Sequence, residues 1–428
     1  MSVSRRGFLG LVGGRASASG AALAARGREA EHAHYQQQSG EQGRAGGAGQ
    51  GAGQQGAGRA GGQGGRGGGR GNRPELPPGV EEIKINSNEN PLGPGKAALD
   101  AILGKFPEAG RYPFNSSPKD GDLVDTIAKK QGAKPENIVL GAGSQEILKS
   151  AMRAFVTPYR ALTIAAPTFE NCTGYARKMK WPLNEIKVDS ACKLDIDGMI
   201  ATARGAGLIF FNNPNNPTAT VHGLKTVTDF VERVRRISPD TVILIDEAYH
   251  DYVTDPAYQT AIPLALATPN VFVARTFSKA YGMAGLRMGY CVGHPETIRK
   301  MADWDSASGT SSLNVLAMAA GVAAIEQDPS FITAERNRNK AVRELAMKWF
   351  SDRGMKPTDS QANFMFVNIG RPAKDFRDAC KTKNVLVARD FPPFEKTHCR
   401  ISFGTMEEMQ KAVKVFEQVL QKKSTAAA

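Results

Sequence analysis

The sequence of 428 residues predicts an α/β fold, with a large, mostly parallel sheet followed by a smaller α+β domain. Between Glu81 and about Thr310, short apolar runs alternate with amphipathic helical patterns, which is typical of parallel strands buried on both faces by helices. Beyond Thr310 the pattern changes to two long helical segments followed by short strands. The hydrophobic fraction of 41% is sufficient for a sizeable core.

The strands of the large sheet are predicted where runs of apolar and β-branched residues are bounded by turn residues. Helical patterns follow two of the turns, at residues 144–155 and 223–237. In chain order, the predicted strands are residues 137–140, 161–167, 207–211, 241–245, 271–274 and 286–292.

The smaller domain is predicted from helical patterns at residues 312–326 and 331–350. Short strands are expected at 363–369, 385–389 and 399–403, and a closing helix starts at Thr405. No internal repeat is visible. The predicted organisation is therefore an N-terminal arm at 75–113, a large α/β domain at 114–308 and a small C-terminal domain at 309–428.

The first 74 residues have the composition of a targeting signal and a linker. Residues 4–9, SRRGFL, resemble a twin-arginine export signal, and Ala22-Leu23-Ala24 fits an A-x-A cleavage pattern. Residues 1–25 are thus predicted to be a twin-arginine-type signal that exports the protein to the periplasm; the alternative is a disordered start on a cytoplasmic protein. Residues 26–74 are rich in Gly, Gln and Arg, which predicts a disordered linker.

The formal net charge of +13 does not indicate a nucleic-acid-binding surface. Residues 1–73 carry ten arginines, no lysine and three glutamates, so they supply more than half of this charge. The remainder is spread thinly over the body, and no aromatic residue is interleaved with the glycine- and arginine-rich stretch. Nucleic acid is therefore not expected as a partner.

The cysteine pattern argues against a metal site or a disulfide framework. Five cysteines are widely spaced and include no CxxC pair, so we expect buried or inert thiols and no metal. No apolar run reaches the roughly 18 residues that a membrane span requires.

Polar residues follow several of the predicted strands, at the edge where an open α/β sheet binds its ligands. Asp246 follows one strand, Lys279 lies shortly after another, and a Gly-rich turn at 141–145 opens a helix. Each motif alone has an ordinary structural explanation. Together they supply an amine for covalent attachment, a carboxylate for a ring nitrogen and a helix N-terminus for a phosphate. These are the parts needed to hold pyridoxal 5'-phosphate (PLP).

The motifs also resemble those of a known family. NPNNPT at 213–218, DEAY at 246–249 and RTFSKAYGMAGLRMGY at 275–290 look like the signature set of fold-type I, class I/II aminotransferases. NENPLG at 88–93 and residues 141–146 point to the histidinol-phosphate aminotransferase branch. The resemblance extends from Glu81 to the C-terminal helix. It implies the fold-type I PLP-transferase fold, a homodimer with shared active sites, an amino donor and a 2-oxo acid acceptor.

The resemblance assigns catalytic roles to Lys279, Asp246 and Tyr249. Lys279 would form the Schiff base and carry the proton, whereas Asp246 would pair with the pyridinium nitrogen. Asn216 and Tyr249 would hydrogen-bond the phenolic oxygen of the ring, and Phe169 would stack on its face. The residues implied for the cofactor phosphate and its turn are Gly143, Ser144, Gln145, Thr276, Ser278 and Arg287, with Tyr112 reaching the phosphate of the neighbouring subunit.

The resemblance implies that Arg400 grips the substrate carboxylate or its counterpart, with Asn90 and Leu92 also at the substrate. Leu92 stands where the family usually carries an aromatic residue, and Ala219 stands where it usually carries glycine. The sequence leaves the substrate pair open. It also leaves two alternatives: a PLP-dependent decarboxylase or lyase of the threonine-phosphate decarboxylase type, and a non-enzymatic RNA- or envelope-binding protein that uses its Arg/Gly-rich segment.

Overall fold

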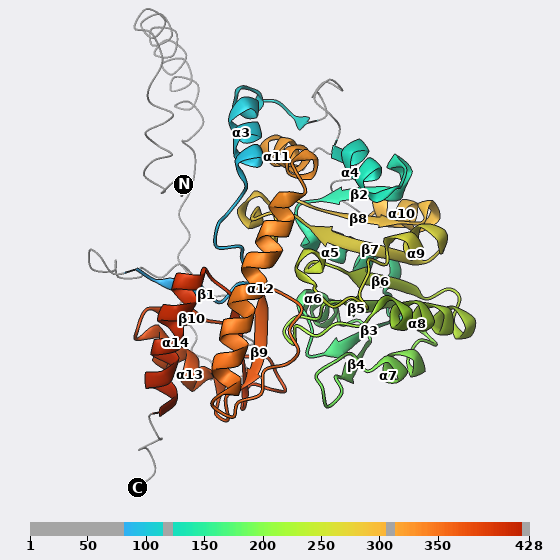
Figure 1. Cartoon of the computed structure of the whole chain (residues 1–428). Helices are drawn as coiled ribbons and strands as arrows, with labels where there is room; N and C mark the ends of the chain where they lie inside the picture. Colours follow the sequence, from blue (N-terminus) through green and yellow to red (C-terminus); the bar gives the residue numbers. More distant parts are fainter. Residues whose placement is uncertain (1–80, 114–122, 305–312, 422–428) are drawn as a thin grey trace, which may run out of the picture. The chain divides into compact units, whose positions relative to one another are not determined.

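The computed structural model describes residues 81–113, 123–304 and 313–421. The predicted signal and linker therefore lie outside the described residues. The predicted α/β class is confirmed by a seven-stranded sheet in the order β2-β8-β7-β6-β5-β3-β4 (Figure 1). Its strands are β2 Ile138–Gly141, β3 Ala161–Ala166, β4 Leu183–Lys187, β5 Ala206–Asn212, β6 Val242–Asp246, β7 Val271–Thr276 and β8 Gly289–Gly293.

The sheet is mostly parallel, as predicted. Only β8 runs against its neighbours, because it pairs antiparallel with both β7 and β2. The register places Asn212 beside Asp246 and Asp246 beside Ala274, so the carboxyl ends of β5, β6 and β7 meet at one edge. The polar residues that follow these strands are therefore brought together there.

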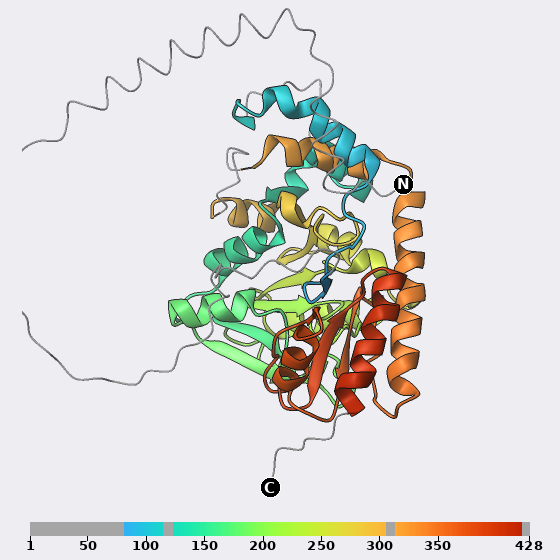
Figure 2. The same ribbon diagram turned by 90° about the vertical axis from the view of Figure 1, so that its left-hand side faces the viewer.

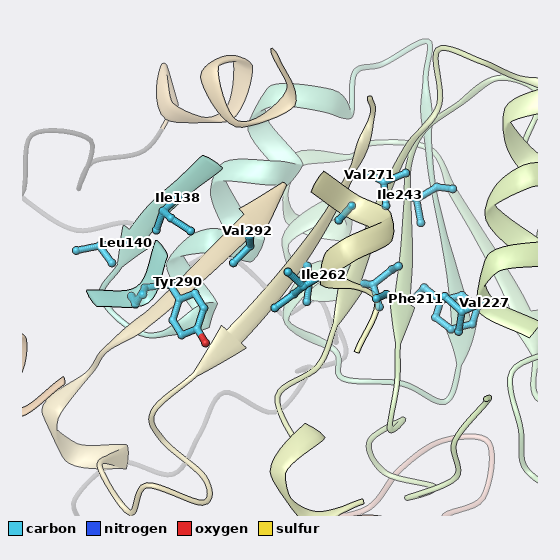
Figure 3. Close-up of a cluster of buried hydrophobic side chains, with 14 of the residues drawn as sticks. Ile138, Leu140, Phe211, Val227, Ile243, Ile262, Val271, Tyr290 and Val292 are labelled. Carbon is cyan, nitrogen blue, oxygen red and sulfur yellow. The ribbon is translucent and has the colours of Figure 1, made fainter. Parts of the chain in front are cut away.

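Helices cover both faces of the sheet. Strand residues alternate between faces, so that in β6 Ile243 and Ile245 point to one apolar cluster while Val242 and Leu244 point to the other. Figure 3 shows part of the first cluster, where side chains of the sheet such as Ile243 lie near Val227 and Ile262. The helices that pack on this face of the sheet are α3 Lys96–Lys105, α4 Leu123–Gln131, α7 Ile196–Ala201, α8 Leu224–Ile237, α9 Ile262–Ala267 and α11 Val315–Glu326. The opposite face is covered by α5 Ser144–Phe155, α6 Asn171–Met179 and α10 Pro295–Ala302.

The C-terminal part has its own core between short sheets and three helices. Strands β9 Phe364–Asn368 and β11 His398–Ser402 pair antiparallel. Strand β1 Ile83–Ile85 of the N-terminal arm pairs in parallel with β10 Val385–Val387, so the arm is joined to this part of the chain. Figure 2 shows the long helix α12 Ser330–Ser351 alongside α14 Met406–Gln421; α13 Ala373–Lys381 completes the set.

The segment predicted as a strand at 286–292 forms regular β-structure only from Gly289 onward. The preceding residues form the short 3-10 turn η6 Ala284–Leu286, and Arg287 then adopts a left-handed backbone with φ +57°. This reversal directs the Arg287 side chain toward Ser278 rather than along the strand.

The prediction of buried thiols is confirmed, since all five cysteines are buried and free. Among the described residues, no single helix is both long and apolar enough to cross a membrane. Helices α11 and α12 meet that test only as a pair, and they are bent by 87° at their junction.

Candidate active site

A cavity of about 480 Å³ lies at the carboxyl ends of β5, β6 and β7. Three parts of the chain line it. The arm contributes residues 86–89, the large sheet contributes its strand ends and the start of α5, and the C-terminal part contributes two arginines, Arg389 and Arg400. Most of the site residues expected from the sequence meet here: Ser144, Gln145, Phe169, Asn216, Asp246, Tyr249, Thr276, Ser278, Lys279, Arg287 and Arg400.

Asp246 ends β6 with its side chain turned into the cavity and only 3% of its surface exposed. Its carboxylate accepts one backbone hydrogen bond, from Ala248 N at 3.2 Å. Burial raises the pKa of Asp246 to about 7, the Ala248 N–H opposes this, and neighbouring Glu247 adds to it. The charged form of such a buried carboxylate is stabilised when a cationic group lies against it.

Lys279 follows β7 and extends its amine into the same cavity. Its Nζ donates to the carbonyl of Ser87 at 3.4 Å and lies 5.6 Å from the ring centroid of Tyr249. Burial, followed by the positive charge of Arg400, lowers the pKa of Lys279 to about 8; Glu89 opposes this shift. A larger fraction of the amine is therefore neutral near pH 7 than for an ordinary lysine.

Tyr249, Asn216 and Arg400 form the wall between the large sheet and the C-terminal part. Arg400 Nη1 donates to Asn216 Oδ1 at 2.7 Å and Nη2 donates to the carbonyl of Asn86 at 2.6 Å. The Tyr249 ring packs edge-on against Phe364, with 4.9 Å between centroids. Burial raises the pKa of Tyr249 to about 12, partly offset by the charge of Arg400, so its hydroxyl remains protonated and able to donate.

The start of α5 forms a cradle suited to an anion. Ser144 is the first residue of this 12-residue helix, and Gly143 before it has φ +78°. A side chain at Gly143 would meet the guanidinium of Arg287, which in turn donates to Ser278 Oγ at 3.3 Å and to the carbonyl of Ala284 at 2.9 Å. Backbone N–H groups, hydroxyls and an arginine thus converge where a phosphate would sit.

The sequence reasoning missed several lining residues. Asn88 and Glu89 were recognised as part of the motif at 88–93 but were assigned no site role, and Asn86 and Ser87 belonged to no motif. Arg389 lines the cavity and pairs with Glu170, and it was missed because it follows the short strand β10 without a recognisable motif. Asn212, the last residue of β5, was also missed.

Four predicted residues do not line the cavity. Asn90 is buried, and its side-chain amide is occupied by backbone groups: Nδ2 donates to Ala280 O at 2.9 Å and Oδ1 accepts from Leu92 N at 2.9 Å. Leu92 and Tyr112 are 64% and 68% exposed. Gly143 lies behind the lining, against Arg287.

The residues present fit PLP. A buried carboxylate with one N–H partner suits a protonated ring nitrogen, and Lys279 suits covalent attachment to an aldehyde. Phe169 provides an aromatic wall, and the Gly143–Arg287 cradle suits a phosphate. Arg400 Nε is buried without a partner, so one donor of this guanidinium is left for a ligand.

Fold and site together define a PLP-binding α/β enzyme, and comparison with known proteins gives its family. The sequence model of the family aminotransferase class I and II matches residues 80–416, so the chain belongs to this family. It is a PLP-dependent transaminase. The predicted enzyme class and cofactor are therefore confirmed.

Curated relatives give a finer likeness. The histidinol-phosphate aminotransferase of Moorella thermoacetica is 33% identical over 352 residues, covering 80% of this chain and 86% of that protein. The enzyme of the same name from Bacillus subtilis is 31% identical over 344 residues, covering 79% and 91%. The crystal structure of histidinol-phosphate aminotransferase from Sinorhizobium meliloti in complex with PLP has a TM-score of 0.71 and 25% identity, covering 79% of this chain and 91% of that one.

Proposed function

We propose that the protein transfers an amino group from an anionic amino donor to a 2-oxo acid, the donor being an amino-alcohol phosphate of the histidinol-phosphate type or an amino acid. The proposal rests on the buried environment of Arg400. Its guanidinium is buried, its two hydrogen-bond acceptors, Asn216 Oδ1 and Asn86 O, are neutral, and it forms no ion pair with any described residue. Burial lowers its pKa to about 10, so it stays charged near pH 7 and requires an anion from a ligand.

A second guanidinium in the cavity supports a donor with a phosphate. Arg389 lines the cavity beside Arg400 and pairs with Glu170, but both side chains of that pair are about half exposed. An exposed pair contributes little free energy, so a phosphate can replace Glu170 as the partner of Arg389. The likeness to histidinol-phosphate aminotransferases favours the same class of donor.

The chain's own residues account for binding and proton movement. PLP, when bound, supplies the electron-withdrawing ring that makes the α-hydrogen of the donor acidic. Lys279 Nζ would accept that proton and release it again, since its lowered pKa leaves a neutral fraction of the amine near pH 7. Asp246 would hold the ring nitrogen, and Arg400 would fix the anionic end of the donor.

The proposal is tested by titrating purified holoenzyme with L-histidinol phosphate and recording the visible spectrum. We expect conversion of the pyridoxal absorption to that of the pyridoxamine form, and its reversal by a 2-oxo acid. A Lys279→Ala variant should show no conversion. An amino-acid panel follows if histidinol phosphate gives no change; release of CO₂ without 2-oxo acid dependence would overturn the proposal and support the lyase alternative.

We infer that the enzyme acts as a homodimer with shared active sites. Large apolar side chains are exposed on the arm and around α3, a feature that marks interaction surfaces. Tyr112 is among them, and it does not line the cavity of its own chain. The exposed residues are Leu92, Leu99, Leu103, Phe106 and Tyr112.

We also propose that residues 1–25 export the protein to the periplasm by the twin-arginine route. Arg5 and Arg6 carry this proposal, together with the A-x-A pattern at 22–24. Fractionation of a twin-arginine-competent host, with mass measurement of the mature protein, is the test. Periplasmic, shortened wild-type protein and a cytoplasmic Arg5→Lys/Arg6→Lys variant are expected; cytoplasmic full-length wild-type protein would contradict it.

A further inference from the structure

Asn88 of the arm contacts Tyr249 directly. Its Nδ2 donates to the tyrosine oxygen at 3.1 Å, and its Oδ1 accepts from Ser402 Oγ at 2.7 Å. Both polar atoms of the Asn88 side chain, Nδ2 and Oδ1, therefore have hydrogen-bond partners, and the residue is only 1% exposed. The Ser402 hydroxyl has a single proton, and its donation to Oδ1 leaves Nδ2 to face the tyrosine.

The backbone of Asn88 is equally constrained. Its N–H donates to Ser402 Oγ at 2.9 Å, and its carbonyl accepts from Asn363 Nδ2 at 3.0 Å. The residue adopts a left-handed backbone with φ +54°, which asparagine tolerates better than most side chains. Ser402 lies on β11 two residues after Arg400. Asn88 is thus anchored to the strand that carries the arginine expected to bind the substrate.

These contacts decide what Tyr249 can do. A tyrosine hydroxyl has one proton, and its oxygen already accepts from Asn88, so its O–H is left to donate elsewhere. Among the described residues, it donates to no protein acceptor in the structure. Tyr249 lines the cavity, and its ring is fixed by Phe364.

We propose that Asn88 is a positioning residue that sets the Tyr249 hydroxyl as a hydrogen-bond donor into the cavity and links it, through Ser402, to the strand of Arg400. The inference rests on the proposed function and on the role that the family resemblance implies for Tyr249, donation of a hydrogen bond to the phenolic oxygen of bound PLP. Asn88 itself contacts neither substrate nor reacting atoms in this account. Its effect is exerted entirely through Tyr249.

The test is a pH titration of the visible absorption of the holoenzyme, a property of the bound cofactor that is measured without turnover. A donor to the phenolate favours the deprotonated chromophore, so weakening that donor should raise its apparent pKa. Asn88→Gly removes both side-chain bonds, while glycine adopts φ +54° without strain. We expect an upward shift of about half to one pH unit, the size of one neutral hydrogen bond.

Asn270→Gly is the matched control. Asn270 also has a left-handed backbone, φ +62°, and its Nδ2 donates to the carbonyl of Pro239 at 3.0 Å, but it lies before β7, away from the cavity. It should lose a similar hydrogen bond and leave the chromophore pKa unchanged.

The Tyr249→Phe variant distinguishes the role of Asn88 from the role of Tyr249. If Tyr249→Phe raises the chromophore pKa and Asn88→Gly does not, the role of Asn88 is overturned while the proposed role of Tyr249 stands. If neither variant raises it, the proposed role of Tyr249 itself is wrong. A downward shift in Asn88→Gly would mean that Tyr249 donates to Asn88, and would also overturn the inference.

Discussion

Lys279 differs from a surface lysine chiefly through its surroundings. Burial, and after it the charges of Arg400 and Arg287, lower its pKa to about 8 from the ordinary 10.5. Only the neutral amine attacks an aldehyde, and the amine becomes neutral as the pH rises through this pKa. We therefore expect the rate at which the apoenzyme captures PLP covalently to increase with pH, with a midpoint near 8.

The Arg400→Gln variant tests whether the charge of Arg400 lowers the midpoint of PLP capture. Removing a positive charge near Lys279 favours its protonated form, so the midpoint of PLP capture should move to higher pH. Arg389→Gln also removes a charge from the cavity wall, but Arg389 is not among the charges that lower the pKa of Lys279, so this variant should move the midpoint less. Stopped-flow absorbance across a pH series measures both midpoints. A wild-type midpoint near that of an ordinary lysine would contradict the prediction.

The turn before α5 gives a prediction at the scale of an element. An alanine Cβ at Gly143 would lie 2.9 Å from Arg287 Cζ, so it would displace the guanidinium from the phosphate cradle. We expect Gly143→Ala to raise the Kd for PLP by about 10- to 100-fold, the value of one charge-assisted hydrogen bond. Fluorescence titration of apoenzyme measures this Kd.

Gly132→Ala is the control for backbone strain. Gly132 also has a positive φ, +63°, but a side chain there would meet nothing within 4 Å. Both variants should lose stability because alanine is strained at positive φ, Gly132→Ala by about 1 kcal/mol and Gly143→Ala by more, because the ψ of 161° at Gly143 belongs to a region that only glycine adopts readily. Only Gly143→Ala should lose cofactor affinity; equal Kd values for the two variants would show that the cradle does not depend on Gly143.

The ends of β6 and β7 are fastened by a buried ion pair. Glu247 Oε2 accepts from Arg275 Nε at 2.8 Å, and Thr260 Oγ1 donates to the same oxygen at 2.8 Å. Each partner is adjacent to a site residue, Asp246 or Thr276. Glu247→Ala would leave the arginine buried and unpaired, so we expect it to destabilise the protein by about 3–5 kcal/mol.

Chemical denaturation of the apoenzyme measures this loss. The control is Asp229→Ala, which removes the partner of Lys225 in an exposed helical pair and should leave the unfolding midpoint unchanged. A Glu247→Leu/Arg275→Met double variant should recover much of the stability, because it leaves no unpaired charge. A midpoint shift no larger for Glu247→Ala than for Asp229→Ala would refute the assigned role.

The sheet interior could be predicted from sequence because its strands are continuous apolar runs buried on both faces. Strand β4 was missed, since Leu183–Lys187 lies at the sheet edge and includes half-exposed polar residues such as Asn184. Strand β1 was also missed, because it has three residues and pairs with β10, far along the chain. Short or partly exposed strands such as β1 and β4 carry little signal of their own, whereas β2, at the opposite edge of the sheet, is buried throughout and was predicted.

The candidate site divides in the same way. Asp246 and Lys279 were predictable because each follows a buried strand at the ligand-binding edge of the sheet. Arg400 was assigned only through resemblance to a family. The contact of Asn88 with Ser402 joins residues 314 positions apart, and no spacing rule anticipates such a pair. Contacts between the arm and the C-terminal part needed the structure.

At the scale of the whole molecule, the proposed homodimer would account for the apolar residues that are exposed on the arm and α3. A second copy of the chain would cover them and bring Tyr112 to the neighbouring cavity.

Deleting residues 1–73 should leave transamination unchanged, because the described residues form the fold and line the cavity without them. Loss of activity in the shortened chain would contradict this prediction.

Subunit mixing tests the shared site. Lys279→Ala and Tyr112→Ala homodimers should each have little activity, since each lacks one residue in both sites. In a mixed dimer, one site combines the intact Lys279 of one subunit with the intact Tyr112 of the other. Random exchange at equal concentrations should therefore restore about a quarter of wild-type activity. If each chain completes its own site, the mixture will show only the average of the two separate activities, and Tyr112 acts within its own subunit or not at all.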